Sequence, residues 1–342
     1  MKIVLCHKDL KRGSIHGGIC AIYCHLAKEL HKLGVEVFTV SSWKTGPSKK
    51  IRHYYVPYTN SANYRERIFY LLNKIDFDII ECSSWKAEGL EYARRKNRKP
   101  IVVRGDLSAF YFDNKIETNP EKELLILADY RLAVSRSCAL DLEKKFGIKI
   151  DKFILNGVDT SSYNLKYRNN FKSKKLLRTI IWVGKPTFAK GFDMLMDLMK
   201  IAPKDLSFYI VFGNTSQNYS MKLIKNKNIR YYQNLSQEKM INLYNKSDVC
   251  LSTSRYESFG LAPLEAMACG TPVVVPKNVP SFGEYVRDGM DGFIYNDLNQ
   301  VIEDIYKVEK LDFKKIRIHA HRFSWRKMAK ETLEVYKFLL SK

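Results

Sequence analysis

Short runs of β-branched and aromatic residues alternate with helix-length segments along almost the whole chain. Several runs are continuously apolar, which is typical of strands covered on both faces of a sheet. We therefore expect βαβ units, parallel sheets and right-handed crossovers. The expected strands are residues 3–7, 36–40, 78–82, 101–104, 131–135, 152–155, 179–183, 208–212, 229–232, 249–253 and 271–275. The expected helices between them include residues 19–33, 120–128, 192–201 and 237–246.

This alternation is interrupted once, by a polar and basic stretch without a sustained period, which is typical of a linker. A length of 342 residues also suits two domains. The predicted fold is therefore α/β, with two Rossmann-like, doubly wound parallel-sheet domains that face each other across a cleft. The predicted parts are a first domain over 1–160, a linker over 161–178, a second domain over 179–320, and a C-terminal helix over 321–342. Whether that helix crosses back to the first domain is left open.

The charge of the chain limits its partners. Lys and Arg number 58 against 36 Asp and Glu, a net charge of +22. Such a balance favours nucleic acid, an anionic membrane face or phosphorylated small molecules. The 45% apolar content excludes a disordered chain. No helix-turn-helix, zinc-finger or RNP signature is present, so we expect no nucleic-acid partner.

The cysteines and the hydropathy bear on localisation. Seven cysteines form an odd, scattered set, which favours reduced thiols over a disulfide framework. No apolar run approaches the roughly 18–20 residues that span a bilayer. We expect a cytoplasmic protein, with peripheral contact on the anionic inner membrane face left open.

The segment from Arg255 to Val273 carries the most chemical information. Pro263 suits the first turn of a helix and Gly270 suits its end. The turn over 258–261 would then present free backbone N–H groups at a helix N-terminus, which is a ready phosphate site. Glu257 and Glu265 flank this turn. They are suited to accept hydrogen bonds from sugar hydroxyls on either side of a diphosphate.

These residues resemble the E-x7-E signature of retaining family 4 glycosyltransferases, which have the GT-B architecture of two Rossmann-like domains. The similarity covers nearly the whole chain. The matching motifs are Glu257-x-Phe259-Gly260 with Glu265, Gly270-Thr271-Pro272-Val273, Asn156-Gly157-Val158-Asp159, Gly184, Lys190-Gly191-Phe192-Asp193, Glu284, Asp288-Gly289-x-Asp291-Gly292, Gly17-Gly18 and Phe323-Ser324-Trp325.

The resemblance implies a role for each matching residue. Glu257 would contact the donor sugar near the reacting centre, and Glu265 would bind the ribose hydroxyls. Lys185 and Lys190 would neutralise the diphosphate of a nucleotide sugar, UDP rather than GDP, without a metal or other cofactor. The implied donor site comprises Gly184, Lys185, Lys190, Glu257, Ser258, Phe259, Gly260, Leu261, Glu265 and Tyr232. For Tyr231 and Tyr232, contact with the base and packing in the strand core are weighed equally.

The chain departs from the family pattern at two positions. Lys185 stands where the family usually has arginine, and lysine lacks the bidentate fork. Asp106 stands where many members place a histidine near the donor sugar, which makes Asp106 a catalytic candidate. Arg104 and Asp113 are the alternatives at this position. The resemblance also assigns Gly17, Gly18 and Arg104 to an acceptor or phosphate loop, with a simple strand-to-helix turn as the less favoured alternative for the two glycines.

The acceptor is the least defined part of the prediction. Basic segments at 11–12 and 65–67 favour a lipid-linked or cell-envelope glycan at an anionic membrane. An aminoglycoside-like acceptor is the alternative, because Asp106, Asp113 and Glu117 would suit a cation. Epimerase or phosphorylase chemistry on the same fold is a further alternative. His16, Cys20, Cys24 and His25 lack a clean four-ligand pattern, so buried helix cysteines are preferred to a metal site.

Overall fold

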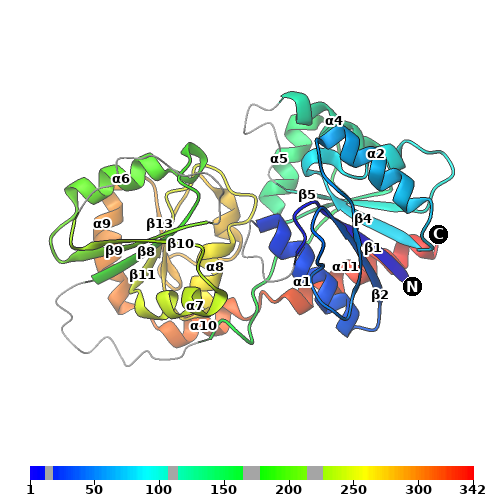
Figure 1. The fold of residues 1–342 in the computed structure, drawn as a ribbon. Helices are drawn as coiled ribbons and strands as arrows, with labels where there is room; N and C mark the ends of the chain where they lie inside the picture. Colours follow the sequence, from blue (N-terminus) through cyan, green and yellow to red (C-terminus); the bar gives the residue numbers. More distant parts are fainter. Residues whose placement is uncertain (12–17, 107–114, 165–177, 214–225) are drawn as a thin grey trace. The chain divides into compact units, whose positions relative to one another are not determined.

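The computed structural model describes residues 1–11, 18–106, 115–164, 178–213 and 226–342 (Figure 1). The chain divides into two compact units. The first unit is Met1–Asn156 together with Trp325–Lys342, and the second unit is Gly157–Ser324. Most of the predicted linker, residues 165–177, lies outside the described residues.

The first unit contains a seven-stranded parallel sheet in the order β3-β2-β1-β4-β5-β6-β7. Its strands are β1 (Lys2–Cys6), β2 (Glu36–Ser41), β3 (Arg52–Tyr55), β4 (Ile79–Ser83), β5 (Ile101–Gly105), β6 (Tyr130–Ala133) and β7 (Lys152–Phe153). Its helices are α1 (Gly18–Lys32), α2 (Ser61–Leu72), η1 (Trp85–Ala87), α3 (Leu90–Ala93), α4 (Lys115–Leu127), α5 (Arg136–Phe146) and α11 (Trp325–Leu340).

The second unit contains a six-stranded parallel sheet in the order β10-β9-β8-β11-β12-β13. Its strands are β8 (Arg178–Gly184), β9 (Leu206–Phe212), β10 (Ile229–Gln233), β11 (Val249–Leu251), β12 (Val273–Pro276) and β13 (Gly292–Tyr295). Its helices are η3 (Phe188–Lys190), α6 (Phe192–Ile201), α7 (Gln237–Lys246), α8 (Leu261–Ala268), η4 (Pro280–Glu284), α9 (Leu298–Lys307), η5 (Val308–Lys310) and α10 (Phe313–Ala320). The predicted fold class, two Rossmann-like parallel-sheet domains, is confirmed.

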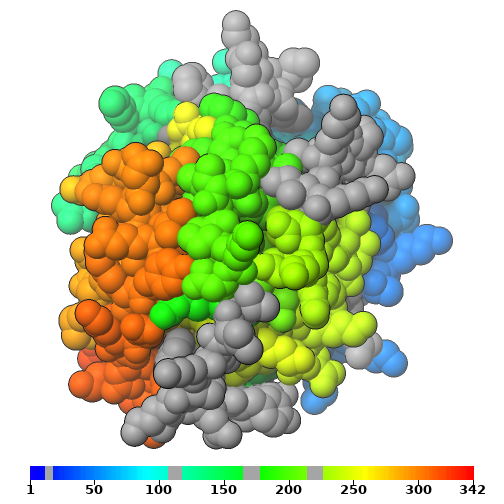
Figure 2. Space-filling view, turned by 90° about the vertical axis from the view of Figure 1, so that its left-hand side faces the viewer, coloured from blue at the N-terminus to red at the C-terminus, as the bar shows by residue number. Residues whose placement is uncertain are grey.

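The continuous apolar strands lie in the interiors of both sheets, as their sequences predict. Ile3, Val4 and Leu5 of β1 are fully buried. In the second unit, residues of α6 and α9 pack with Trp182 and Phe208 in one core cluster. Figure 2 looks onto the outer surface of these two helices, where α6 in green and α9 in orange lie side by side. The indole N–H of the buried Trp182 donates to Thr253 Oγ1 at 3.0 Å, so its burial leaves no unpaired donor.

A buried polar network attaches α11 to the first sheet. Arg104 Nε donates to Glu81 Oε1 at 2.7 Å, and Arg104 Nη2 donates to Thr332 Oγ1 of α11 at 3.0 Å. The hydroxyl of Tyr336, also on α11, donates to Glu81 Oε2 at 2.6 Å. Arg104 is 1% exposed. This placement differs from the expected position of Arg104 at an acceptor or phosphate loop, because its guanidinium is enclosed in the core by an ion pair.

Helix α2, which the membrane hypothesis invokes, buries part of its apolar surface and exposes the rest. Its residues Tyr64, Ile68 and Leu72 are buried. Arg65 is also buried, and its guanidinium donates to the main-chain oxygen of Lys86 at 2.8 and 2.6 Å. Phe69 and Leu71 are partly exposed and Tyr70 is 62% exposed, so membrane contact of this segment stays a prediction. Among the described residues, no helix has both the length and the apolarity needed to cross a bilayer.

Candidate functional site

The predicted donor-site residues gather at the carboxyl edge of the second sheet. Lys185 directly follows β8, and Glu257 lies in the loop after β11. Strands β8 and β11 are parallel neighbours, so both loops leave the same edge. Ligands of open parallel sheets bind outside this edge.

Lys190 and Glu257 form the centre of this site. Lys190 Nζ lies 2.5 Å from Glu257 Oε1, and Ser254 Oγ donates to the same oxygen at 2.9 Å. The main-chain oxygen of Glu257 accepts from Ser281 Oγ at 3.1 Å. Both side chains are only partly buried, with 32% of Lys190 and 14% of Glu257 exposed. The structure therefore brings together two residues that are far apart in sequence and leaves both accessible to a ligand.

Two contacts that the sequence analysis missed join the loops carrying this pair. Arg255 makes a bidentate ion pair with Asp193, with both N···O distances at 2.7 Å. Gly191 has a φ of +61°, and a Cβ there would lie 1.8 Å from the main-chain oxygen of Thr253. Asp193 and Arg255 both stand inside the motifs, but nothing in the sequence indicated that they pair. The loop after β8 can approach the loop after β11 only because residue 191 has no side chain.

The turn before α8 is held by aromatic rings. Gly260 has a φ of +87°, and its carbonyl accepts from the hydroxyl of Tyr285 at 2.7 Å. Phe259 is 1% exposed and stacks on Tyr285 with centroids 5.0 Å apart. The ring of Phe259 is therefore a core group that supports the turn and not a surface that touches the donor. Ser258, Gly260 and Leu261 are partly exposed, and the first N–H groups of α8 have no partner within the helix.

Glu265 lies on α8 and is partly buried. The hydroxyl of Tyr244 donates to Glu265 Oε2 at 3.0 Å. Burial raises the pKa of Glu265 to about 7, although hydrogen bonds from Tyr244 and Tyr163 act in the opposite direction. The carboxyl group therefore titrates near neutral pH. Neither tyrosine was predicted from the sequence, because Tyr244 comes from α7 and Tyr163 from the segment after residue 157.

Three other predicted donor-site residues in the described part of the chain, Gly184, Lys185 and Tyr232, are not joined to the Lys190–Glu257 pair by side-chain hydrogen bonds or ion pairs. The side chain of Lys185 is exposed, and the carbonyl of Gly184 accepts from the N–H of Gly213 at 3.0 Å. Tyr231 packs against the core cluster, whereas Tyr232 lies edge-on to Tyr209 with centroids 5.7 Å apart. Among the described residues, no hydrogen bond or ion pair joins Lys185 or Tyr232 to Lys190 or Glu257.

Only some of the site residues predicted in the first unit lie in the described part of the chain. Gly18 is exposed at the start of α1, and Asp106 follows β5 and is 7% exposed. Gly17 and Asp113 lie outside the described residues, as does the side chain of Glu117.

The cysteines and His25 near the start of the chain, for which a metal site was considered and not preferred, make other contacts. Cys20 Sγ donates to the carbonyl of Asp9 at 2.9 Å, and Cys24 Sγ donates to that of Lys11 at 3.3 Å. The ring of His25 stacks on Trp325 with centroids 4.8 Å apart, and His16 lies outside the described residues. Within the described ranges, no group of three or more His, Cys, Asp or Glu side chains is placed to hold a metal ion.

Solved structures with the same two-sheet architecture define the fold as GT-B. A sucrose-phosphate synthase of Thermosynechococcus elongatus superposes with a TM-score of 0.82 at 18% identity, covering 99% of both chains. Anabaena HepE in complex with UDP-glucose superposes with a TM-score of 0.73 at 18% identity, covering 98% of this chain and 99% of that one.

The family follows from the sequence matches. The model for glycosyltransferase family 4 matches residues 16–162, and the model for glycosyl transferases group 1 matches residues 165–331. The chain therefore belongs to the group 1, family 4 glycosyltransferases. An uncharacterised glycosyltransferase of Methanocaldococcus jannaschii is 25% identical over 82% of this chain and 80% of its own length. An uncharacterised Klebsiella pneumoniae protein from a cps region is 30% identical, over 48% of this chain and 47% of its own length.

Proposed function

We propose that the chain transfers a sugar from a UDP-sugar to a hydroxyl acceptor with retention of configuration. The observation that carries this proposal is the Lys190–Glu257 pair, because it sets a cation and a carboxylate beside the N-terminus of α8 at one sheet edge. Membership of the family supports the reaction class. The UDP-glucose complex of HepE supports UDP as the nucleotide.

The diphosphate is assigned to Lys185, Lys190 and the first turn of α8. The departing UDP gains negative charge as the bond from the anomeric carbon to the β-phosphate oxygen breaks. Cations and N–H dipoles aimed at that oxygen stabilise the transition state more than the ground state. Lys190 is already oriented by Glu257, so little reorganisation is needed when the diphosphate arrives.

The two glutamates are assigned to the sugars on either side of the diphosphate. Glu265 accepts hydrogen bonds from the ribose hydroxyls, which its ionised form does best. Because the pKa of Glu265 is about 7, donor binding should weaken as the pH falls below neutrality. Glu257 accepts from hydroxyls of the transferred sugar.

Transfer is proposed to occur on the same face of the sugar that UDP leaves. The acceptor oxygen forms its bond to the anomeric carbon, and the acceptor proton passes to the departing phosphate oxygen. Asp106 is the alternative proton acceptor, since it follows β5 at the carboxyl edge of the first sheet. Lys185 and Lys190 take the role that a divalent cation would have, so we expect no metal requirement.

Cell-envelope polysaccharide synthesis and peripheral contact with an anionic membrane remain proposals. They rest on the net charge of +22 and on α2, where Phe69, Tyr70 and Leu71 are at least partly exposed. Flotation of the protein with anionic liposomes at low salt tests the membrane contact, and its absence would favour a soluble acceptor.

Isothermal titration with UDP, followed by mass spectrometry of products from a UDP-sugar panel, tests the proposed function. The wild type should bind UDP and transfer sugar. Glu257→Gln should keep UDP affinity and lose transfer, whereas Glu238→Gln, an exposed glutamate on α7, should behave like wild type. A wild-type protein that binds no UDP would refute the proposed donor.

A further inference from the structure

A second cluster of charged and aromatic side chains lies at the carboxyl edge of the first sheet. Lys8 follows β1, and Lys86 lies in η1 after the neighbouring strand β4. Both ammonium groups lie near the ring of Tyr58, with Nζ to centroid distances of 5.0 Å for Lys8 and 5.7 Å for Lys86. Two cations from different loops therefore share one aromatic ring at the edge where parallel sheets bind ligands.

The backbone at Lys86 is held in an unusual conformation. Lys86 has a φ of +64° and Ala87 a φ of +50°, in the left-handed region that residues with a side chain rarely adopt. The guanidinium of Arg65, itself 8% exposed, fixes this turn by donating twice to the carbonyl of Lys86. A buried arginine thus holds a strained turn that sets the position of the Lys86 ammonium.

The charges around this cluster do not cancel. Lys8 Nζ pairs with Asp9 Oδ1 at 2.6 Å. Among the described residues, Lys86 has no ion pair, although it is half-buried. A third cation lies nearby: Lys11 Nζ is 3.7 Å from the ring centroid of Trp43, and Trp43 lies in the loop after β2. The edge therefore carries three lysines against two carboxylates, that of Asp9 and the buried one of Glu88, which accepts from the main-chain N–H of Lys8 at 2.7 Å.

Aromatic surface accompanies these cations. Trp43 is 43% exposed, and Tyr55, at the end of β3, is 47% exposed. The hydroxyl of Tyr64 is buried without a hydrogen-bond partner among the described residues, and its ring packs edge-on to Tyr58 with centroids 5.5 Å apart. Exposed aromatic rings suit the C–H faces of a sugar, and lysine ammonium groups suit a phosphate or carboxylate.

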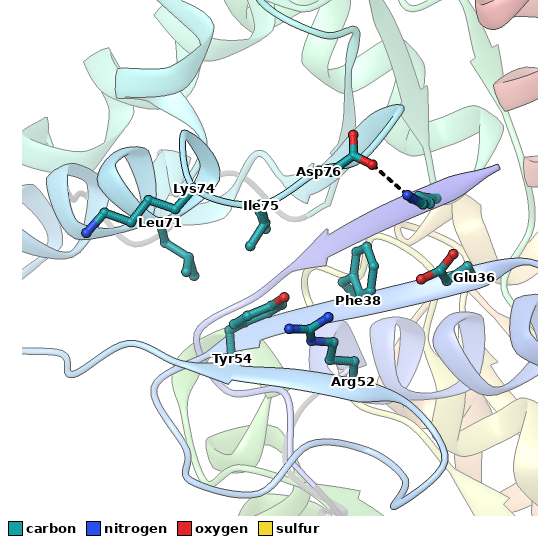
Figure 3. Close-up of a pocket in the computed structure, with 9 residues that line it drawn as sticks. Glu36, Phe38, Arg52, Tyr54, Leu71, Lys74, Ile75 and Asp76 are labelled. Carbon is teal, nitrogen blue, oxygen red and sulfur yellow. Dashed lines mark hydrogen bonds and ion pairs between the residues drawn. The ribbon is translucent and has the colours of Figure 1, made fainter.

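The opposite edge of the same sheet also carries charged side chains. A pocket of about 380 Å³ there is lined by residues at the starts of β1, β2 and β3 and by the end of α2 (Figure 3). Lys2 in this pocket pairs with Asp76 at 2.5 Å, and Glu36 adds a further negative charge beside Arg52 and Lys74. Three cations therefore face two carboxylates in this pocket, and one of the cations, Lys2, is already paired with Asp76.

We propose that the carboxyl edge of the first unit binds an anionic saccharide, a sugar with a phosphate or carboxylate group, as the acceptor. Lys86 and Lys8 are its specificity-determining residues, and the Arg65 contact positions Lys86. This inference rests on the proposed function and names the chemical class of its acceptor. An aminoglycoside-like cation would meet repulsion from the same lysines.

The test compares sugars that differ only in charge. The full chain with a UDP-sugar is offered glucose, glucose 6-phosphate, glucuronate, inositol and inositol phosphate, and glucosamine as the cation. UDP release gives KM and kcat for each, and UDP affinity is measured on the same preparations. We expect turnover with at least one anionic member and a KM at least tenfold lower than for its neutral counterpart. The phosphate and carboxylate arms identify which group is bound.

The variant Lys8→Gln/Lys86→Gln should raise the KM for the anionic acceptor at least tenfold and leave kcat and UDP affinity nearly unchanged. Lys74→Gln, at the opposite edge, should match wild type. A preference for neutral or cationic sugars, or an unchanged KM in the double variant, would overturn the inference while leaving the proposed function intact. Absence of UDP binding would instead refute the proposed function.

Discussion

Replacing Glu265 by glutamine should stabilise the protein and weaken nucleotide binding at the same time. Burial raises the pKa of Glu265 from 4.5 to about 7, so the folded state disfavours the ionised carboxylate. At about 1.4 kcal/mol per pH unit, the difference corresponds to roughly 3 kcal/mol at pH values above 7. Glutamine keeps an oxygen for Tyr244 but carries no charge, so it avoids this penalty.

The sign of the pH dependence follows from the raised pKa. An acid whose pKa is higher in the folded state destabilises the fold increasingly as pH rises from its unfolded pKa to its folded pKa. The free energy of unfolding of wild type should therefore fall between pH 5 and pH 8, relative to that of Glu265→Gln, by about 2 kcal/mol. Urea titrations at both pH values measure this difference.

Nucleotide affinity should change in the opposite direction. Loss of a charged acceptor for the ribose hydroxyls should weaken UDP binding by roughly 10- to 100-fold, measured by isothermal titration at pH 8. Glu238→Gln, on the exposed surface of α7, should change neither quantity. A stability difference that does not vary with pH, or an unchanged UDP affinity, would refute this account of Glu265.

Three further outcomes follow from the second unit. Lys190→Gln should lower kcat by about 100- to 1000-fold. Lys246→Gln, at an exposed residue of α7, should leave kcat unchanged. Equal rates for the two variants would contradict the role of Lys190. Gly191→Ala should lower the free energy of unfolding by at least about 3 kcal/mol, because its Cβ would meet Thr253; Gly147→Ala, also at positive φ but in open space, should cost only about 1–2 kcal/mol. Turnover should persist in excess EDTA, and a tenfold loss that Mg²⁺ or Mn²⁺ restores would contradict a metal-independent reaction.

Periodicity predicted the elements that are well buried on one or both faces. Helices α6 and α7 were predicted with the bounds that the structure shows. Strand β3 was missed because Arg52–Tyr55 is an edge strand with no buried residue, so it has no apolar run to recognise. Helix α4 begins at Lys115, so Pro120, its predicted start, lies inside the helix.

The candidate site was predictable where motifs carried it. Glu257 and Lys190 were assigned to one site from family motifs, and their side chains are in contact. Phe259 stands in the same motif and was assigned to the donor site, but its side chain is buried. A motif marks a position in the chain and does not say which way the side chain points. Arg104 was expected at an acceptor or phosphate loop, but its guanidinium pairs with Glu81 in the core. Glu81 lies on a different strand, and no sequence signal links the two residues.

A crystal structure of the chain with bound UDP tests the central claim most directly. We expect the diphosphate within hydrogen-bond distance, about 3 Å, of Lys190 Nζ and the N–H groups at the start of α8, with Glu265 accepting from the ribose hydroxyls. UDP bound elsewhere, with Lys190 and Glu265 contacting only their present protein partners, would contradict the assignment of this sheet edge as the donor site.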